Sequence, residues 1–271
     1  MRRGGRSDGG WAHSSERCRH ARERARPSGP RSDANARPAG AGPYGGCRTR
    51  SELWYALPVT QVGERQLFHF THIRNLQGIF ADKCLVSDTT MQLRGGVPVE
   101  CGDRDIKAAR RTRRVLVHPY GVPSDYVPFY FAPRSPMLYK INKGSVPTYQ
   151  EGQTPLVYFV TTVDAAVATG QCCVFSDGNC AAEITRHFDQ LDLLAEVVDW
   201  KVISARIWAN TADDGDRMRR RMAEFLVHER LPLSAVCEVA AYDHAHAEQV
   251  SSVLRSASVD LPVSVRRTWY Y

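Results

Sequence analysis

The sequence predicts an α+β domain built on a mainly antiparallel sheet, and three observations lead to this prediction. Strand-like segments with a two-residue period mix with short helical segments, but without the strict strand–helix–strand order of a parallel sheet. Within residues 61–271 neither a GxGxxG motif nor a Walker loop is present, which argues against a Rossmann or P-loop domain. The chain has 271 residues, 43% of them hydrophobic, so it can bury a core without cross-links.

The basic charge is concentrated at the start of the chain. Residues 1–50 contain 12 Arg and 4 acidic residues, whereas residues 51–271 contain 24 basic and 25 acidic residues. Because the first segment is rich in Arg, Gly and Pro and poor in large aliphatic side chains, we expect residues 1–60 to be a disordered extension. A transit peptide and a translation start placed too far upstream are alternative interpretations. We expect residues 61–271 to form one nearly neutral domain, which would bind nucleic acid only through a local basic patch.

No segment predicts export, membrane insertion or metal binding. The apolar runs are too short for a signal peptide or a bilayer span, so the expected location is the cytoplasm and no membrane partner is expected. The 8 cysteines include no CxxC pair, which favours free thiols over a structural zinc site. We therefore expect no metal cofactor.

The first predicted strand carries two polar residues on one face. Residues 67–72 alternate as a half-buried strand, which places His69 and Thr71 on the same side. Residues 73–80 predict a short helix. Gly78 within it lowers helix propensity and suggests close approach of another group, while a tolerated surface glycine explains it equally well.

A long segment with little apolar periodicity follows a brief strand at residues 85–87. Residues 87–123 are too many for a simple connection, so we interpret them as a functional loop containing a helix at residues 105–114. Arginines load the C-terminal end of this helix, as its dipole favours. Two interpretations are open: the arginines attract phosphate groups of a ligand, or they form a solvated face of the helix.

Residues 126–131, YVPFYF, predict a strand that Pro128 confines to a sheet edge or a bulge. Pro136 suits the first turn of a helix capped by Ser135. Arg134 precedes this helix and follows the aromatic run. Guanidinium groups and tyrosines stack on unpaired bases, so this loop is a candidate nucleic-acid contact, although the apolar residues after Pro136 also fit a core.

The remaining elements are shorter. The sequence predicts strands at residues 156–161, 173–176, 200–208, 236–241 and 263–269, helices at residues 163–169, 180–187 and 245–255, and a polar loop at residues 210–216. A turn over residues 177–179 is expected to cap the helix at 180–187.

Glu224 is the carboxylate that best fits a catalytic role. It follows Arg219, Arg220 and Arg221 and precedes an apolar strand. Neighbouring guanidinium groups would keep it ionised and the strand would fix its direction, so it could orient or deprotonate a substrate. An ordinary solvated ion pair is the alternative.

Three segments stand out together: LFHFTHIRNLQGIF, the basic helix before SDYVPFYFAPRSPMLY, and RRRMAEFLV. In this order and spacing they resemble the DarT family of DNA ADP-ribosyltransferase toxins, from about Gln66 to the C-terminus. The resemblance implies the ADP-ribosyltransferase fold, a split antiparallel sheet around an NAD cleft. It also implies transfer of ADP-ribose from NAD+ to a thymine base of single-stranded DNA with release of nicotinamide, and a macrodomain antitoxin as partner.

The resemblance assigns the NAD+ contacts and the catalytic residues. His69, Phe70 and Thr71 match the strand that grips NAD+, and Gly78 and Val86 fall at further NAD+ contacts, with Val86 where Leu is expected. Glu224 matches the catalytic glutamate. Arg110 aligns with an arginine that binds NAD+ and is proposed to help abstract the base proton; Arg111 or Arg113 takes its place if the loop is aligned differently.

The resemblance also assigns contacts with DNA to three segments. These are Arg134, Ser135, Pro136, Met137, Leu138 and Tyr139; Ala209, Asn210, Thr211 and Ala212; and Met218, Arg219, Arg220, Arg221 and Met222.

The chemistry of these side chains agrees with such a reaction. His69 and Thr71 can hydrogen-bond the nicotinamide side of NAD+, and Glu224 can bind the ribose 2′-hydroxyl and stabilise positive charge at the anomeric carbon. Guanidinium stays protonated, so we expect Arg110 to stabilise a thymine anion rather than to act as the base. The competing hypotheses are an ADP-ribosyltransferase acting on RNA or protein, an RNA 2′-phosphotransferase, and a non-catalytic nucleic-acid-binding module.

Overall fold

The structure, a computed structural model, describes residues 59–271. The extension predicted for residues 1–60 lies outside this part, apart from its last two residues, which begin a short 3₁₀ helix at Val59–Glu64. The strands are β1 (Gln66–His72), β2 (Cys84–Val86), β3 (Tyr126–Tyr130), β4 (Leu156–Thr162), β5 (Cys173–Ser176), β6 (His187–Phe188), β7 (Glu224–His228), β8 (Arg230–Pro232), β9 (Glu238–Ala241) and β10 (Val263–Val265). The helices are α1 (Leu76–Asp82), α2 (Asp88–Leu93), α3 (Arg104–Arg110), α4 (Pro136–Asn142), α5 (Val163–Ala168), α6 (Leu194–Val197), α7 (Trp200–Ser204), α8 (Arg217–Arg221) and α9 (His244–Ser256).

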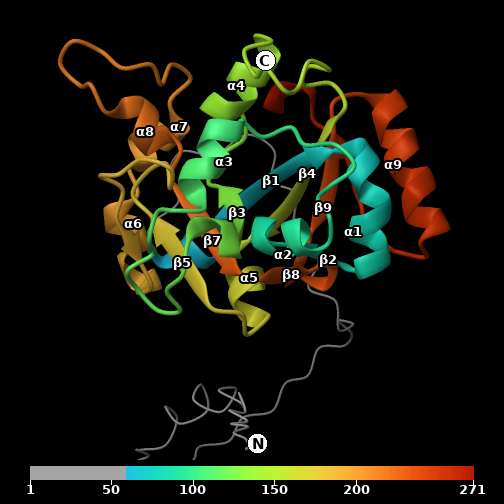
Figure 1. Cartoon of the computed structure of the whole chain (residues 1–271), viewed down its shortest axis with the longest axis horizontal. Helices are drawn as coiled ribbons and strands as arrows, with labels where there is room; N and C mark the ends of the chain where they lie inside the picture. The colour runs from blue at the N-terminus through green and yellow to red at the C-terminus, as the bar shows by residue number, and fades with distance from the viewer. Residues whose placement is uncertain (1–58) are drawn as a thin grey trace, which may run out of the picture. The chain divides into compact units, whose positions relative to one another are not determined.

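The main sheet has eight strands in the order β10-β9-β4-β1-β3-β7-β5-β6 (Figure 1). All its pairings are antiparallel except that of β9 with β10. Strands β2 and β8 form a separate antiparallel pair. The prediction of an α+β domain with a mainly antiparallel sheet is confirmed.

The sheet opens between its two central strands. β1 pairs with β4 over its whole length and β3 pairs with β7 likewise, but β1 and β3 share only the register pair Phe68 and Tyr130. The ring nitrogen Nδ1 of His69 instead lies 2.8 Å from the carbonyl oxygen of Pro128. The prediction that Pro128 confines its strand to a sheet edge or a bulge is wrong, because β3 is internal and pairs with β7 in unbroken register. The backbone nitrogen of Pro128 carries no hydrogen, and it faces the opening, where no hydrogen bond to a neighbouring strand is required.

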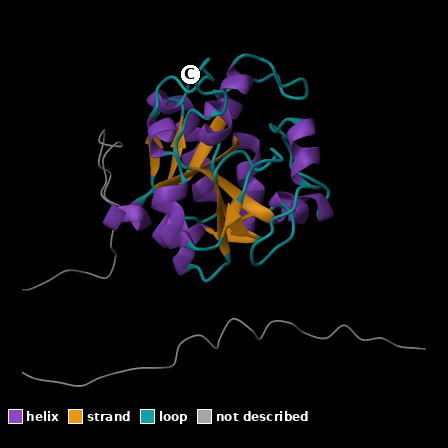
Figure 2. Cartoon of the chain, turned by 90° about the vertical axis from the view of Figure 1, so that its left-hand side faces the viewer, coloured by secondary structure: helices purple, strands orange, loops and turns teal. Residues whose placement is uncertain are grey.

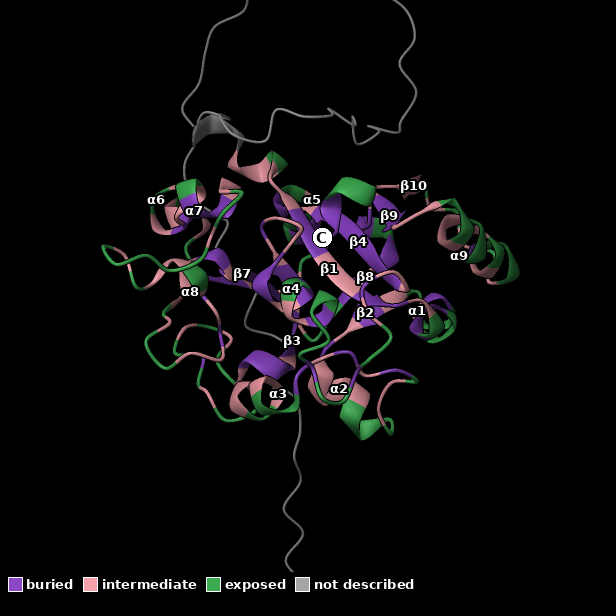
Figure 3. Cartoon of the chain, turned by 90° about the horizontal axis from the view of Figure 1, so that it is seen from above, coloured by how far each residue is buried: buried purple, intermediate pink, exposed green. Residues whose placement is uncertain are grey.

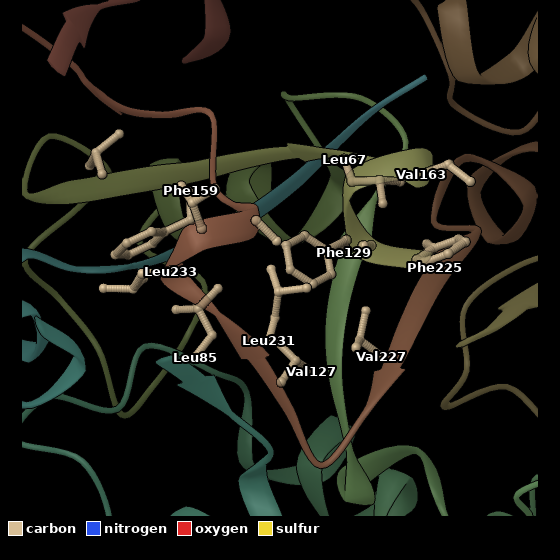
Figure 4. Close-up of a cluster of buried hydrophobic side chains, with 14 of the residues drawn as sticks. Leu67, Leu85, Val127, Phe129, Phe159, Val163, Phe225, Val227, Leu231 and Leu233 are labelled. Atoms are coloured by element: carbon tan, nitrogen blue, oxygen red, sulfur yellow. The ribbon is translucent and has the colours of Figure 1, made fainter. Parts of the chain in front are cut away.

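A hydrophobic core fills one face of this sheet. Side chains from neighbouring strands, among them Leu67, Phe129, Phe159 and Phe225, converge there with Leu231 from β8 (Figure 4). They occupy every second position of their strands, as alternation in a sheet requires. This core fixes β1, β3 and β7 relative to one another and thereby sets the width of the opening.

Aromatic residues dominate the core of the other face near β1 and β4. The ring of Phe68 lies 5.1 Å from that of Trp269, and Tyr158 lies 5.4 Å from Tyr270, measured between centroids. Leu138 of α4 is buried in the same cluster. Helix α4 is thus anchored beside the opening of the sheet.

The helices flank the strands, as Figure 2 shows. Helix α9 begins at its cap Asp243, whose side chain accepts a hydrogen bond from the His246 backbone, and buries Val250 and Leu254 in the main core. Its outer face is exposed (Figure 3). Helices α1 and α9 lie near the β9 end of the sheet, whereas α6, α7 and α8 lie near β5 and β7 (Figures 1 and 3).

Two predicted elements are wrong. Residues 180–187, predicted as a helix, form a loop that returns as β6, because Asn179 accepts hydrogen bonds from Ala181 and Ala182 and β6 pairs with β5. Residues 200–208, predicted as a strand, begin with helix α7, because the side chain of Asp199 caps the backbone N–H of Val202 at 3.0 Å.

Two further elements end earlier than predicted. Helix α3 ends at Arg110, four residues before the predicted end, and β10 ends at Val265, after which a 3₁₀ turn covers Arg267–Trp269. Helix ends are set by caps that short sequence patterns specify poorly.

Candidate active site

A cavity of about 950 Å³ lies at the opening of the sheet. Residues of β1, α2, α3, β3 and α4 line it, together with residues 206–209 and the segment that leads into β7. Helices α3 and α4 stand in front of β1 and β3 (Figure 1). The volume suits a dinucleotide-sized ligand.

Glu224 forms the floor of this cavity. It is the first residue of β7 and is 2% exposed. Its backbone N–H donates to Ser176 Oγ at 3.0 Å, and its Oε1 accepts from the Cys180 N–H at 3.0 Å. Ser176 ends β5, which pairs with β7 and thereby fixes the backbone of Glu224, whereas the turn after β5 brings the Cys180 N–H to the carboxylate.

Arg110 holds the other side of the carboxylate. Its Nη1 donates to Oε1 and Oε2 of Glu224 at 2.8 and 2.7 Å, and Nη2 lies 3.4 Å from the Pro123 carbonyl oxygen. The residue ends α3, a helix capped by Asp103. Burial lowers the pKa of Arg110, but the charge of Glu224, the hydrogen bonds to its carboxylate and smaller contributions together outweigh burial, so the pKa is raised above its usual value. Arg110 therefore stays a cation and has no lone pair with which to accept a proton.

The arginines next to Glu224 in sequence do not pair with it, so the prediction that they keep it ionised is wrong. Arg219 bonds Asp216 and Asp177, Arg220 bonds Asp214, and the buried Arg221 donates to the Pro133 carbonyl at 2.9 Å. These contacts hold α8 and its loops together, and none of the three lines the cavity.

The arginines at and after the end of α3 have different partners. Arg111 pairs with Asp88 on the surface, and Arg113 lies near Glu183 and the Ala181 carbonyl. Arg110 is the one that contacts Glu224, across 114 residues of sequence.

His69 lies in the opening beside this pair. Because a carbonyl oxygen can only accept, His69 Nδ1 carries the hydrogen that bonds Pro128, and Nε2 is left as an acceptor. Burial lowers the pKa of His69, the bond to Pro128 partly opposes this shift, and the charge of Arg110 adds to it. His69 is therefore neutral near pH 7.

Thr71 lines the same cavity and is held by a buried amide. Asn75 Nδ2 donates to Thr71 Oγ1 and to the Val99 carbonyl, each at 2.9 Å, and Asn75 Oδ1 accepts from the Val99 N–H. Residues of both strand parities, from Phe68 to Thr71, line the cavity. His69 and Thr71 lie two positions apart in β1, so they share one strand face as predicted, and both line the cavity.

The other residues that the resemblance assigns fall into two groups. Phe70, Val86, Pro136, Met137, Tyr139, Ala209, Met218 and Met222 line the cavity. Gly78 does not. It is exposed on α1, and a Cβ placed there would meet no other atom of the described residues within 4 Å, which fits the alternative of a surface glycine.

Several assigned residues instead shape the cavity wall. Ser135 caps α4 as predicted, accepting from the Leu138 N–H at 3.2 Å, and Leu138 is core. Arg134 adopts a left-handed backbone with φ of 56° and stacks on Tyr271. The Asn210 side chain accepts from the Met218 N–H at 2.8 Å, and the neighbouring Thr211 and Ala212 belong to the same exposed loop.

Sequence reasoning missed five residues of the site. Cys180 and Ser176 position Glu224, Asn75 positions Thr71, and Trp208 and Tyr271 line the cavity. The turn at residues 177–179 was visible in the sequence and could have pointed to the backbone of Cys180. No local pattern marks Tyr271.

Within residues 59–271, no helix is long and apolar enough to cross a membrane. Over the same residues, no three His, Cys, Asp or Glu side chains are grouped as ligands for a metal ion. The six cysteines in this part of the chain form no disulfide.

An antiparallel sheet that opens onto a cavity with a buried glutamate agrees with the ADP-ribosyltransferase fold, the split sheet around an NAD cleft that the resemblance implies. A family model described as "ssDNA thymidine ADP-ribosyltransferase, DarT" matches residues 68–271. The chain belongs to the DarT family and is a DNA ADP-ribosyltransferase.

Individual relatives agree with this assignment. A DNA ADP-ribosyl transferase of Thermus sp. (strain 2.9) is 36% identical over 208 residues, which cover 76% of this chain and 95% of the relative. One from Mycobacterium tuberculosis (strain ATCC 25618 / H37Rv) is 35% identical over 191 residues, 69% of this chain and 81% of the relative.

Solved structures agree as well. Thermus sp. 2.9 DarT in complex with ADP-ribosylated ssDNA matches with a TM-score of 0.71 and 34% identity, covering 76% of this chain and 96% of that one. The same protein in complex with NAD+ matches with a TM-score of 0.67, 33% identity and coverage of 76% and 98%.

Proposed function

We propose that the protein transfers ADP-ribose from NAD+ to a thymine base of single-stranded DNA and releases nicotinamide. The observation that carries the proposal is the buried pair of Arg110 and Glu224, which shares a cavity of about 950 Å³ with His69. NAD+ is the co-substrate, and the Thermus DarT structures with NAD+ and with ADP-ribosylated ssDNA support this reaction.

Glu224 acts on the ribose at the reacting carbon. As the bond from the anomeric carbon to nicotinamide breaks, its electron pair leaves with nicotinamide and positive charge develops on the ribose. Glu224 accepts a hydrogen bond from the ribose 2′-hydroxyl and stabilises this charge in a site from which most water is excluded. Its fixed position means that no reorganisation is needed during the step.

The thymine ring nitrogen then bonds the anomeric carbon and loses its proton. Arg110 has donors only, so it stabilises negative charge on the thymine and does not take the proton. The carboxylate of Glu224 accepts the proton and passes it to solvent. The alternative role of Arg110 as the base does not fit its raised pKa.

His69, Phe70 and Thr71 bind the nicotinamide side of NAD+. The neutral His69 offers Nε2 as an acceptor, and Thr71 is oriented by Asn75. Val86 of β2 lines the cavity and contributes an apolar contact.

Single-stranded DNA enters along α4 and the segment before β7. Pro136, Met137, Tyr139, Ala209, Met218 and Met222 provide its contacts. Arg219, Arg220 and Arg221 act indirectly, since their partners lie within the protein and hold this segment in place. A base inside a duplex hides its ring nitrogen, so an unpaired thymine is the substrate.

In the cell the protein serves as the toxin of a toxin–antitoxin system in the cytoplasm. Its antitoxin is a macrodomain protein that removes ADP-ribose from DNA. The family resemblance supports this role, and rescue of growth by such a macrodomain during expression of the protein tests it.

Mass spectrometry of oligonucleotides after incubation with NAD+ tests the reaction. We expect a thymine-containing single strand to gain one ADP-ribose with release of one nicotinamide. A matched single strand without thymine, the duplex form of the thymine-containing strand and an RNA strand should stay unmodified. Modification of RNA alone would reject the DNA substrate. Binding of DNA without nicotinamide release would support a non-catalytic module.

A further inference from the structure

Three aromatic side chains from distant parts of the chain meet on one side of the cavity. The ring of Tyr139 lies 5.7 Å from that of Trp208 and 5.0 Å from that of Tyr271, at interplanar angles of 83° and 69°. All three residues line the cavity. We call Tyr139, Trp208 and Tyr271 the aromatic wall.

Hydrogen bonds fix the aromatic wall. Trp208 Nε1 donates to Tyr271 Oη at 3.1 Å, and Tyr271 Oη donates to the Arg134 carbonyl at 2.6 Å. The backbone N–H of Tyr271 donates to Gln153 Oε1 at 3.0 Å. The rings are therefore held before a ligand arrives, which lowers the entropy lost on binding.

The surface around the aromatic wall is apolar and exposed. Ile207 is 76% exposed, Met218 is 43% exposed and Tyr139 is 39% exposed, and all three line the cavity. Exposed apolar groups gathered at a concave site indicate a surface that binds a ligand or a partner.

Cations stand beside this apolar surface. Lys143 Nζ lies 5.4 Å from the centre of the Tyr139 ring, and the Arg134 guanidinium lies 4.6 Å from that of Tyr271. Arg206 is exposed and lines the cavity next to Ile207. The two cations lie over the faces of these rings. Aromatic rings accompanied by cations match an unpaired nucleic-acid strand, in which bases alternate with phosphates.

We propose that the aromatic wall stacks the base next to the target thymine, and that Lys143 and Arg206 bind the phosphates on either side of that base. This subsite rests on the proposed function and extends it, since neither Trp208, Tyr271, Lys143 nor Arg206 belongs to the segments that the resemblance assigns. The DNA is thereby recognised through a neighbouring nucleotide as well as through the thymine.

Steady-state kinetics of Trp208→Ala and Trp208→Phe test the aromatic wall. With a single-stranded oligonucleotide, Trp208→Ala raises the DNA KM about tenfold, since stacking of one base contributes on the order of one tenfold step in affinity. The kcat and the NAD+ KM stay within about twofold. Trp208→Phe keeps a ring and recovers most of the affinity. An unchanged DNA KM, or an equal rise of the NAD+ KM, overturns the proposal.

Lys143→Gln provides a second test that does not depend on the packing of Trp208. Loss of one phosphate contact lowers the slope of log affinity against log salt concentration by about 0.7 for a single strand. Arg255→Gln on the exposed side of α9 is the matched charge control and leaves the slope unchanged. Equal slopes for Lys143→Gln and the control overturn the phosphate assignment.

Fluorescence titration separates failure of this subsite from failure of the proposed function. Wild-type protein shows quenching of tryptophan emission by the oligonucleotide, and Trp208→Phe lacks this quenching. Absence of ADP-ribosylated DNA with the quenching retained contradicts the proposed function alone. ADP-ribosylated DNA without any Trp208-dependent quenching contradicts the subsite alone, as does quenching by RNA and not by DNA.

Discussion

The floor and the mouth of the cavity are built in opposite ways. At the floor, His69, Arg110 and Glu224 are brought together from three remote segments, and hydrogen bonds hold each of these three side chains. At the mouth, Ile207 and Met218 are exposed apolar residues on loops or a short helix. Bond breaking needs preorganised charges away from water, whereas binding of a base needs an open flat surface. Changes at the floor should abolish the reaction, and changes at the mouth should weaken it by degrees.

Glu224→Gln should have the largest effect on catalysis. The amide keeps the shape of the side chain and an oxygen for the Cys180 N–H, but it removes the charge that stabilises the ribose cation. We expect nicotinamide release to fall by about 100-fold or more in single-turnover assays. The NAD+ affinity should change by only a few-fold. Full activity of this variant would contradict the claim that the reaction depends on the floor of the cavity more than on its mouth.

Arg110→Met should damage both stability and activity. It leaves the charge of Glu224 buried without its main partner, which costs about 3–5 kcal/mol in the free energy of unfolding. Arg111→Met is the matched control, because that arginine pairs with Asp88 at the surface and should cost less than about 1 kcal/mol. Urea unfolding of both variants measures the difference. Similar losses would contradict a buried pair at the floor.

Local patterns predicted most of the sheet and singled out His69 and Glu224, whereas the family resemblance assigned Arg110, and no local pattern predicted the contacts that join these residues. The alternation around His69 and the apolar run after Glu224 are local signals, and both strands formed as expected. The pairing of Glu224 with Arg110 spans 114 residues and depends on tertiary packing, so the adjacent arginines were the wrong partners. The helix predicted at residues 180–187 is wrong for the same reason, because the pairing of β6 with β5 outweighs the helical pattern of these residues.

Arg219→Gln tests whether the arginines before β7 support the mouth rather than bind DNA. Arg219 links Asp216 with Asp177, and these bonds raise its pKa. Losing them should lower the free energy of unfolding by about 1–3 kcal/mol in urea. The salt dependence of DNA binding should stay as in the wild type. A lower salt slope with unchanged stability would instead place Arg219 on the DNA.

The dependence of the rate on pH tests the neutral state of His69. Burial lowers its pKa below the usual value of 6.5, so the acceptor Nε2 is retained as the pH falls through 6.5 and is lost only at lower pH. The kcat/KM for NAD+ should therefore fall with an apparent pKa below 6.5, and His69→Gln should lack this fall. The unfolded chain binds the proton at higher pH than the folded one, so stability should also decrease as the pH drops below 6.5. A rate that rises on acidification would contradict a neutral His69.

A crystal structure of the Glu224→Gln variant with NAD+ and a thymine-containing single strand tests the central claim most directly, since the slow variant keeps both substrates intact. We expect the nicotinamide ribose between position 224 and His69, with the thymine ring nitrogen facing its anomeric carbon and Arg110 beside the base. NAD+ bound elsewhere, or a thymine remote from position 224, would contradict the account.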